Sequence, residues 1–267
     1  MKKLKKPNFS SLSDYFPENF NEFVYFLGEI TYFSGSFFTN LRLNSYGVLE
    51  FFRQCYRVGN KSLLLVSITG FILGLVLTIQ TRPMLAEFGA EAWVPGLVAV
   101  SIIREMGPVI TALIIAGKVG SGFGAELGSM RVTEQIDAME VSGTNPMRYL
   151  VVTRVLATTL MVPILVIYAD SIAMIGSFIG INLHGKVAIT LFINQSIESL
   201  GYIDIIPSTI KTFFFGFAIG IIGTYKGYYS GRGTEKVGMA ANSAVVAASM
   251  AIFIIDLIAV QLTELFY

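Results

Sequence analysis

Five ionisable residues interrupt stretches of the sequence that are otherwise apolar: Arg104, Glu105, Asp170, Lys211 and Asp256. An ion at the centre of a bilayer costs roughly 2.5–3.5 kcal/mol, so each of these side chains should face protein or water and have a partner. Arg104 and Glu105 are adjacent and project about 100° apart on a helix, so they cannot satisfy each other well. We therefore predict that Lys211 pairs with Asp256 or with Glu105.

The composition indicates the class of protein that carries these charges. Of 267 residues, 54% are hydrophobic and 14% are charged, whereas soluble proteins carry about 25% charged residues. The chain is therefore predicted to be a polytopic membrane protein of the all-α class. Its net charge of +1 gives no sign of a nucleic-acid partner. One cysteine, Cys55, and one histidine, His184, argue against an intrachain disulfide and a zinc site, and we expect no metal and no cofactor.

Five apolar segments are long enough to cross a bilayer, which takes about 20 residues. They cover residues 62–81, 94–117, 154–181, 205–225 and 238–265. Arg and Lys residues collect before the first segment, between the second and third, and between the fourth and fifth. Because positive charge marks the cytoplasmic side, this pattern predicts an N-terminus inside and a C-terminus outside. The basic N-terminal stretch has no apolar segment behind it and is not expected to act as a signal peptide.

The N-terminal part of the chain differs from these spans. Residues 16–52 carry aromatic side chains at helical spacing, mixed with acidic residues, and contain no uncharged run long enough to cross a bilayer. We expect one or two amphipathic helices lying in the membrane interface. Packing of the same face against the spanning helices is the alternative. The chain thus divides into an N-terminal interfacial region, 1–61, and a five-helix membrane domain, 62–267.

The depth of the ionisable residues points to a use for them. A rise of about 1.5 Å per residue places all five in one layer, near the middle of the membrane or in its outer half. Such a layer suits a polar chamber for an amphipathic cargo, whose headgroup meets the charges while apolar side chains hold its acyl chains. The alternatives are buried ion pairs that only fix the register of the helices, and a proton relay. No sequential chain of carboxylates supports the relay.

Four G-x-x-x-G pairs occur in the spans, starting at Gly70, Gly176, Gly216 and Gly223. Such pairs allow helices to approach closely. Because five spans are few for enclosing a lipid-sized path, a homodimer around a shared cavity is the economical arrangement. Packing within one chain explains these glycines equally well.

The sequence between the second and third spans combines glycines with charge. Residues 120–125 match G-x-G-x-x-A formally, but no strand precedes them, and no P-loop sequence occurs, so any ATP that drives this protein binds another chain. We expect the glycines to form an elbow leading into a charged helix over 126–140, which Asn145-Pro146 ends. A helix at the inner membrane surface suits docking of a soluble protein; a solvated surface helix is the alternative. Its charges include Glu126, Arg131, Glu134 and Asp137.

A long stretch around this segment resembles the MlaE-type permeases, the membrane subunits of ABC lipid transporters that work with MCE-domain proteins. The stretch is IIREMGPVITALIIAGKVGSGFGAELGSMRVTEQIDAMEVSGTNPMRYLVVTRVLA, and its core, GAELGSMRVTEQIDAMEVSG, is long and specific. The resemblance implies an interfacial helix, five spans and a homodimer. It implies a cytoplasmic or stromal ATPase that docks on the segment containing Glu126, Arg131, Glu134 and Asp137, and an MCE-domain substrate-binding protein on the outer side.

The resemblance also implies the cargo, a phospholipid or another polar lipid that is moved between inner and outer membranes. It places Arg104, Glu105, Lys211 and Asp256 in the lipid path. The location it implies is a bacterial or cyanobacterial inner membrane or a plastid inner envelope. The chain would not be an enzyme, because hydrolysis belongs to the ATPase. Two rival functions are an ion- or proton-coupled carrier that acts alone and a non-transporting scaffold for MCE and ATPase subunits.

Overall fold

The chain folds into a bundle of helices. The structure, a computed structural model, describes residues 18–41, 45–183 and 185–265, and within these ranges it contains no strand. The all-α class that the composition predicts is confirmed. The basic N-terminal stretch and His184 lie outside the described residues.

Within the described ranges, the α-helices are joined by short connections and by helical turns of other kinds. They are α1 (Glu18–Thr39), α2 (Ser45–Glu87), α3 (Val94–Ser101), α4 (Gly107–Ile115), α5 (Ser121–Val132), α6 (Gln135–Val141), α7 (Thr153–Asn182), α8 (Ile189–Glu198), α9 (Tyr202–Tyr228) and α10 (Thr234–Glu264). A 3-10 turn, Glu91–Trp93, precedes α3, and a π-helical turn, Met147–Val152, leads into α7. Two further π-helical turns, Ile102–Met106 and Ala116–Gly120, connect α3, α4 and α5 into one continuous rod.

Five of these helical stretches are long and apolar enough to cross a membrane, as the sequence predicts. They are Gly47–Glu87, Glu91–Val132, Met147–Asn182, Tyr202–Tyr228 and Thr234–Glu264. All five exceed the roughly 20 residues that cross the hydrocarbon core.

The first span departs furthest from its predicted bounds. α2 begins at Ser45 and runs without a break through Lys61, whereas we predict a span that starts at residue 62. Arg53 and Arg57 therefore lie on the helix itself rather than in a basic segment before it. No proline interrupts this part of the chain, so nothing in the backbone ends the helix there. The boundary between the two sequence regions falls inside α2.

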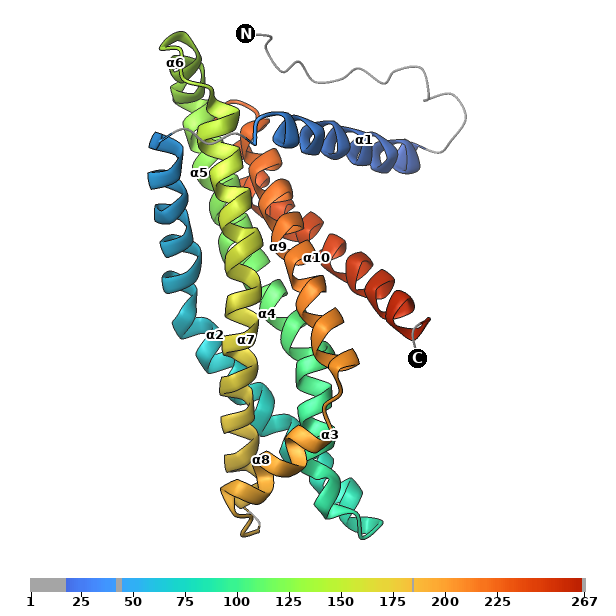
Figure 1. Cartoon of the computed structure of the whole chain (residues 1–267). Coiled ribbons are helices and arrows are strands. Elements are labelled where there is room, and N and C mark those ends of the chain that lie inside the picture. The colour runs from blue at the N-terminus through green and yellow to red at the C-terminus, as the bar shows by residue number, and fades with distance from the viewer. Residues whose placement is uncertain (1–17, 42–44, 184, 266–267) are drawn as a thin grey trace.

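α1 lies across one end of the bundle, the end that also carries α6 (Figure 1). Its Phe33 is fully buried and makes edge-to-face contacts with Tyr225 and Tyr229 at the end of α9. The hydroxyl of Tyr225 donates a hydrogen bond to the carboxylate of Glu29. One face of α1 thus packs against the spanning helices, as in the second of our two alternatives. Its placement in a membrane interface stays a prediction.

α7 is the centre of the bundle. In the span that contains α7, 67% of the most apolar stretch is buried, against 17% in the span formed by α10. α10 also leans away from the other spans toward its C-terminal end (Figure 1). The bundle is therefore closed around α7 and open along α10.

The G-x-x-x-G pairs pack within the chain. A Cβ atom added to Gly74 would lie 1.8 Å from the carbonyl oxygen of Ala173, so α2 and α7 meet backbone to backbone. Comparable close contacts occur at Gly176 against α2 and at Gly216 against α7, and a looser one, 3.1 Å, occurs at Gly223 against Gly120 just before α5. Contacts inside one chain therefore account for these glycines, and they give no support of their own to a homodimer.

The elbow that we predict at residues 120–125 is wrong. α5 carries the rod straight through these glycines as far as Val132. The chain turns at Glu134, whose φ of 59° lies in the left-handed region and separates α5 from α6. Gly124 serves packing instead, since a Cβ atom on it would lie 3.0 Å from the carbonyl oxygen of Ala240 in α10. A glycine run permits both a bend and a close helix contact, and here the contact explains it.

Candidate functional site

Three spans bring opposite charges together: the rod of α3 to α5, α9 and α10. The ammonium Nζ of Lys211 lies 2.7 Å from Oε2 of Glu105 and 2.8 Å from Oδ1 of Asp256. Only 4% of the Lys211 side chain is exposed, against 19% for Asp256 and 37% for Glu105. Lys211 therefore has both of the partners that we predict, on two different spans. We call these three residues the lysine triad.

A π-helical turn presents the two adjacent ions of the rod. The N–H of Gly107 donates to the carbonyl of Ile102, five residues earlier, so the helix is widened by one residue at Arg104 and Glu105. Glu105 reaches Lys211, while Arg104 reaches a different turn of α9. Arg104 and Glu105 are adjacent and project in different directions, so they do not pair with each other. Each contacts α9 at a different point instead. Such π-turns are frequent at functional sites.

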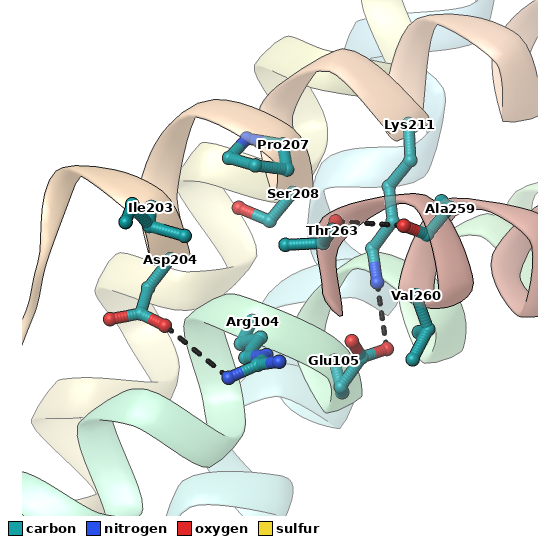
Figure 2. A pocket seen from close by; sticks show the side chains of 10 residues that line it. All are labelled: Arg104, Glu105, Ile203, Asp204, Pro207, Ser208, Lys211, Ala259, Val260 and Thr263. Atoms are coloured by element: carbon teal, nitrogen blue, oxygen red, sulfur yellow. Dashed lines mark hydrogen bonds and ion pairs between the residues drawn. The ribbon is translucent and has the colours of Figure 1, made fainter. Parts of the chain in front are cut away.

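Asp204 is an ionic partner that the sequence prediction missed. Its Oδ1 lies 3.6 Å from Nη1 of Arg104 (Figure 2), and its Oδ2 accepts a hydrogen bond from the N–H of Gly201, just before α9. Its side chain is 8% exposed. The span that we predict at 205–225 leaves Asp204 just outside the membrane helix, whereas the structure places it in the first turn of α9. The seven-residue interval to Lys211, about two helical turns, is the signal that could have placed both on one face.

The charges line a narrow cleft that adjoins an apolar groove. The cleft encloses about 10 Å³, which is room for one water molecule. The groove, between α9 and α10, encloses about 670 Å³. Its apolar wall includes Ile206, Ile210, Phe214, Ile258 and Leu262. Pro207, Lys211 and Thr263 line both the cleft (Figure 2) and the groove, so the charges lie at the border of an apolar surface.

Asp170 stands apart from the other predicted ions. It lines a separate pocket of about 230 Å³ between α7 and α9. Its Oδ1 is buried without a hydrogen-bond partner among the described residues. The carboxyl packs against Gly107, where an added Cβ atom would lie 1.8 Å from Oδ1. Of the five ions that we predict in one layer, four form ion pairs there, and Asp170 forms none within the part of the chain that the structure describes.

Comparison with known proteins identifies the family. Residues 51–262 match the family model of the permease MlaE. The chain belongs to the MlaE permease family. It is 40% identical to a probable ABC transporter permease protein of Rickettsia prowazekii, over 80% of this chain and 82% of that protein. It is 34% identical to the intermembrane phospholipid transport system permease protein MlaE of Haemophilus influenzae, over 77% of this chain and 79% of that protein.

A relative from a plant belongs to the same group. The chain is 34% identical to the chloroplastic protein TRIGALACTOSYLDIACYLGLYCEROL 1 of Arabidopsis thaliana, over 77% of this chain and 59% of that protein. The family resemblance that the sequence motif indicates is thereby confirmed. As an MlaE-family member with five membrane-spanning helices, the chain is an integral membrane permease of ABC-type transport.

The charged segment of this MlaE-family chain consists of the end of α5, the turn at Glu134 and α6, and α6 projects beyond the other helices (Figure 1). Arg131 pairs with Asp137 at 2.8 Å, and Glu134 pairs with Arg232 at 3.2 Å. Val141, at the end of α6, is 91% exposed. The segment therefore presents a small surface of mixed charge and one bare apolar side chain.

Glu126 differs from the other charges that we assign to this segment. Its Oε1 lies 3.0 Å from Nη1 of Arg57 in α2 and 3.1 Å from Nη2 of Arg154 in α7. The Arg154 side chain is 3% exposed, and its Nη1 also donates to the carbonyl of Leu150. Glu126 thus joins three spans of the permease within the bundle. The sequence carries no signal for this contact, because the two arginines are distant along the chain and each fits a basic inner loop equally well.

Proposed function

We propose that this chain is the membrane subunit of an ABC-type lipid transporter, which moves a phospholipid or another polar lipid between an inner and an outer membrane. The observation that carries the proposal is the position of the lysine triad at the border of the apolar groove. A membrane lipid joins a polar headgroup to apolar chains. The border offers ions to the headgroup and an apolar wall to the chains. Ligand sites of this kind combine a mostly apolar lining with a few placed polar groups.

The same geometry supports a mechanism of alternating access. The cleft between α9 and the rod is filled by ion pairs, so a headgroup enters only when Lys211 exchanges a partner. α10 is the least buried span, and a shift of α10 away from α9 separates Asp256 from Lys211 and widens the groove. Closure of an ATPase at the end that carries α6 would drive that shift through α5, because α5 packs against both α9 and α10.

The family supplies the partners in this proposal. An ATPase subunit docks at α6 and an MCE-domain protein binds at the opposite end, near α8. Two copies of the chain face each other along the open side of α10. The N-terminus lies on the cytoplasmic or stromal side. The membrane is a bacterial inner membrane or a plastid inner envelope, in keeping with a Haemophilus relative named for intermembrane phospholipid transport and a chloroplastic Arabidopsis relative.

The test uses the purified complex of permease, ATPase and MCE-domain protein in liposomes and follows transfer of a labelled lipid. The variant that combines Lys211→Met, Glu105→Gln and Asp256→Asn removes the triad's ions and leaves no charge unpaired. We expect transfer to fall by about tenfold or more, equivalent to about 1.4 kcal/mol, while the complex still assembles. Ser101→Ala, which alters an exposed hydroxyl on the same rod, is the matched control and should transfer lipid normally.

Other results would contradict this proposed function or support a different one. Transfer at the normal rate by the triple variant would remove the triad from the lipid path. Flux through the permease without its ATPase, driven by a pH gradient, would identify a carrier that acts alone. A purified wild-type complex that holds no lipid and transfers none would identify a scaffold.

A further inference from the structure

The pocket around Asp170 has a polar side that the lysine triad does not use. It lies between α7 and α9 and encloses about 230 Å³, many times the roughly 10–15 Å³ that one water molecule needs by the same measure. It therefore has room for a small chemical group. Its polar wall consists of Asp170, Ser171, Ser208, Thr209 and Thr212.

Each hydroxyl of this wall already uses its proton. Ser171, Ser208, Thr209 and Thr212 each donate to a backbone carbonyl three or four residues earlier on their own helix, at 2.6–2.9 Å. A hydroxyl has one proton to donate and two lone pairs that accept. What these side chains still offer to a ligand is therefore acceptor oxygen.

Asp170 adds the strongest acceptor to the same wall. Its Oδ1 is buried without a hydrogen-bond partner among the described residues. A buried polar atom left unpaired costs about 1–3 kcal/mol. The two cations of the layer, Arg104 and Lys211, form ion pairs with other carboxylates. No cation among the described residues is therefore left for Asp170, and a ligand that supplies a hydrogen-bond donor would satisfy its carboxyl group.

The charge of the surroundings restricts the ligand further. Ser208 lines both this pocket and the charged cleft, so the two lie on either side of one residue. Two cations, Arg104 and Lys211, and three acids, Glu105, Asp170 and Asp204, line the cleft and the pocket. A fourth acid, Asp256, pairs with Lys211. An excess of carboxyl groups disfavours an anionic ligand, since like charges at short range repel strongly in a low-dielectric interior.

We propose that the Asp170 pocket binds the donor-bearing part of a lipid headgroup that carries no net negative charge, and thereby selects among cargo lipids. The inference rests on the proposed transport function and adds the class of substrate to it. Two headgroup chemistries supply such donors: the hydroxyls of a neutral sugar and the ammonium of a zwitterionic lipid. A phosphate monoester headgroup is disfavoured by the same wall.

The experiment measures bound lipid by native mass spectrometry, after the whole complex is exposed to equal amounts of three probes. The probes are monogalactosyl diacylglycerol, phosphatidylethanolamine and phosphatidic acid, with matched acyl chains. The wild-type complex should retain one of the first two about tenfold over phosphatidic acid. Asp170→Leu, close in volume and without an acceptor, should abolish the preference and leave the amount of phosphatidic acid unchanged.

A second variant separates the two headgroup chemistries and guards against misfolding. Asp170→Asn keeps the shape and one acceptor oxygen but cannot carry charge. A preference for the galactolipid should survive this change in part, whereas a preference for the ammonium lipid should be lost. Ser101→Ala should retain the wild-type preference.

The failures are distinguishable. Bound lipid with the same preference in the wild type and in both Asp170 variants would overturn this inference and leave the transport proposal standing. A wild-type preference for phosphatidic acid would do the same. A wild-type complex that holds none of the three lipids would overturn both.

Discussion

Glu126 and Arg154 form an ion pair that joins α5 to α7 inside the bundle, with 3.1 Å between Oε1 and Nη2. Arg57 of α2 shares the same carboxylate oxygen at 3.0 Å. Arg154 depends on this contact, because it is almost fully buried and its Nε has no partner among the described residues. α5 continues through the turn at Glu134 into α6, and α7 carries Asp170. The ion pair therefore links the proposed docking surface to a span that borders the proposed lipid site.

The first prediction is that Glu126→Gln destabilises the permease. It leaves the buried guanidinium of Arg154 without its counter-ion, at an expected cost of about 1–3 kcal/mol, because Glu126 is partly exposed and water replaces some of the loss. The measurement is the Tm of the purified chain in detergent. Glu134→Gln is the matched control, since its pair with Arg232 is largely exposed and worth about 0–1 kcal/mol. An unchanged Tm together with lost ATPase binding would instead show that Glu126 contacts the ATPase, as the family resemblance implies.

The second prediction concerns the cost of breaking the lysine triad unevenly. Lys211→Met alone leaves the carboxylates of Glu105 and Asp256 unpaired in the cleft, so we expect a loss of about 3 kcal/mol in the free energy of unfolding. The triple variant that also carries Glu105→Gln and Asp256→Asn should recover most of that stability, since no ion remains to be paired. Thermal unfolding of the two variants side by side measures the difference. A triple variant as unstable as the single one would mean that packing, rather than charge, decides stability at this position.

The partners of Lys211 could be predicted from the sequence because apolar surroundings leave an ion few choices. A buried ammonium must find a carboxylate, and Glu105 and Asp256 lie at a matching depth in other spans. The five spans follow from similar reasoning, since a run of about 20 apolar residues has few other uses. Both predictions succeed because an unpaired ion in apolar surroundings, or a long apolar segment in water, has a free-energy cost that few folds can tolerate.

Other features depend on distances between helices, which no local pattern records. Asp204 lies seven residues from Lys211, but its role required knowing where α9 begins. Glu126 looked like a surface charge, because the burial of Arg154 beside it depends on how α2, α5 and α7 pack. A glycine such as Gly124 allows a bend and a close contact equally, and only the position of α10 decides between them.

The third prediction tests the close packing of α2 against α7 by substituting two glycines. A Cβ atom on Gly74 would lie 1.8 Å from a backbone oxygen of α7, so Gly74→Ala forces the two helices apart and should cost about 1–3 kcal/mol. Gly122→Ala is the matched control. An added Cβ there meets nothing within 4 Å, and alanine favours a helix over glycine by up to about 1 kcal/mol. We expect a lower Tm for the first variant and an equal or higher Tm for the second. The reverse order would contradict the close contact of α2 with α7.

The fourth prediction is that charge reversal on α6 detaches the ATPase. Asp137→Lys replaces an ion pair with Arg131 by a repulsion on an exposed surface, so it should change the docking face and leave the bundle folded. We expect the ATPase to be lost from the purified complex while the MCE-domain protein remains. Glu198→Lys makes the same change in charge on α8, at the opposite end of the bundle (Figure 1), and should keep the ATPase. Stoichiometric ATPase with Asp137→Lys would show that α6 is an ordinary solvated helix, and the ATPase would then have to act on the permease through another surface.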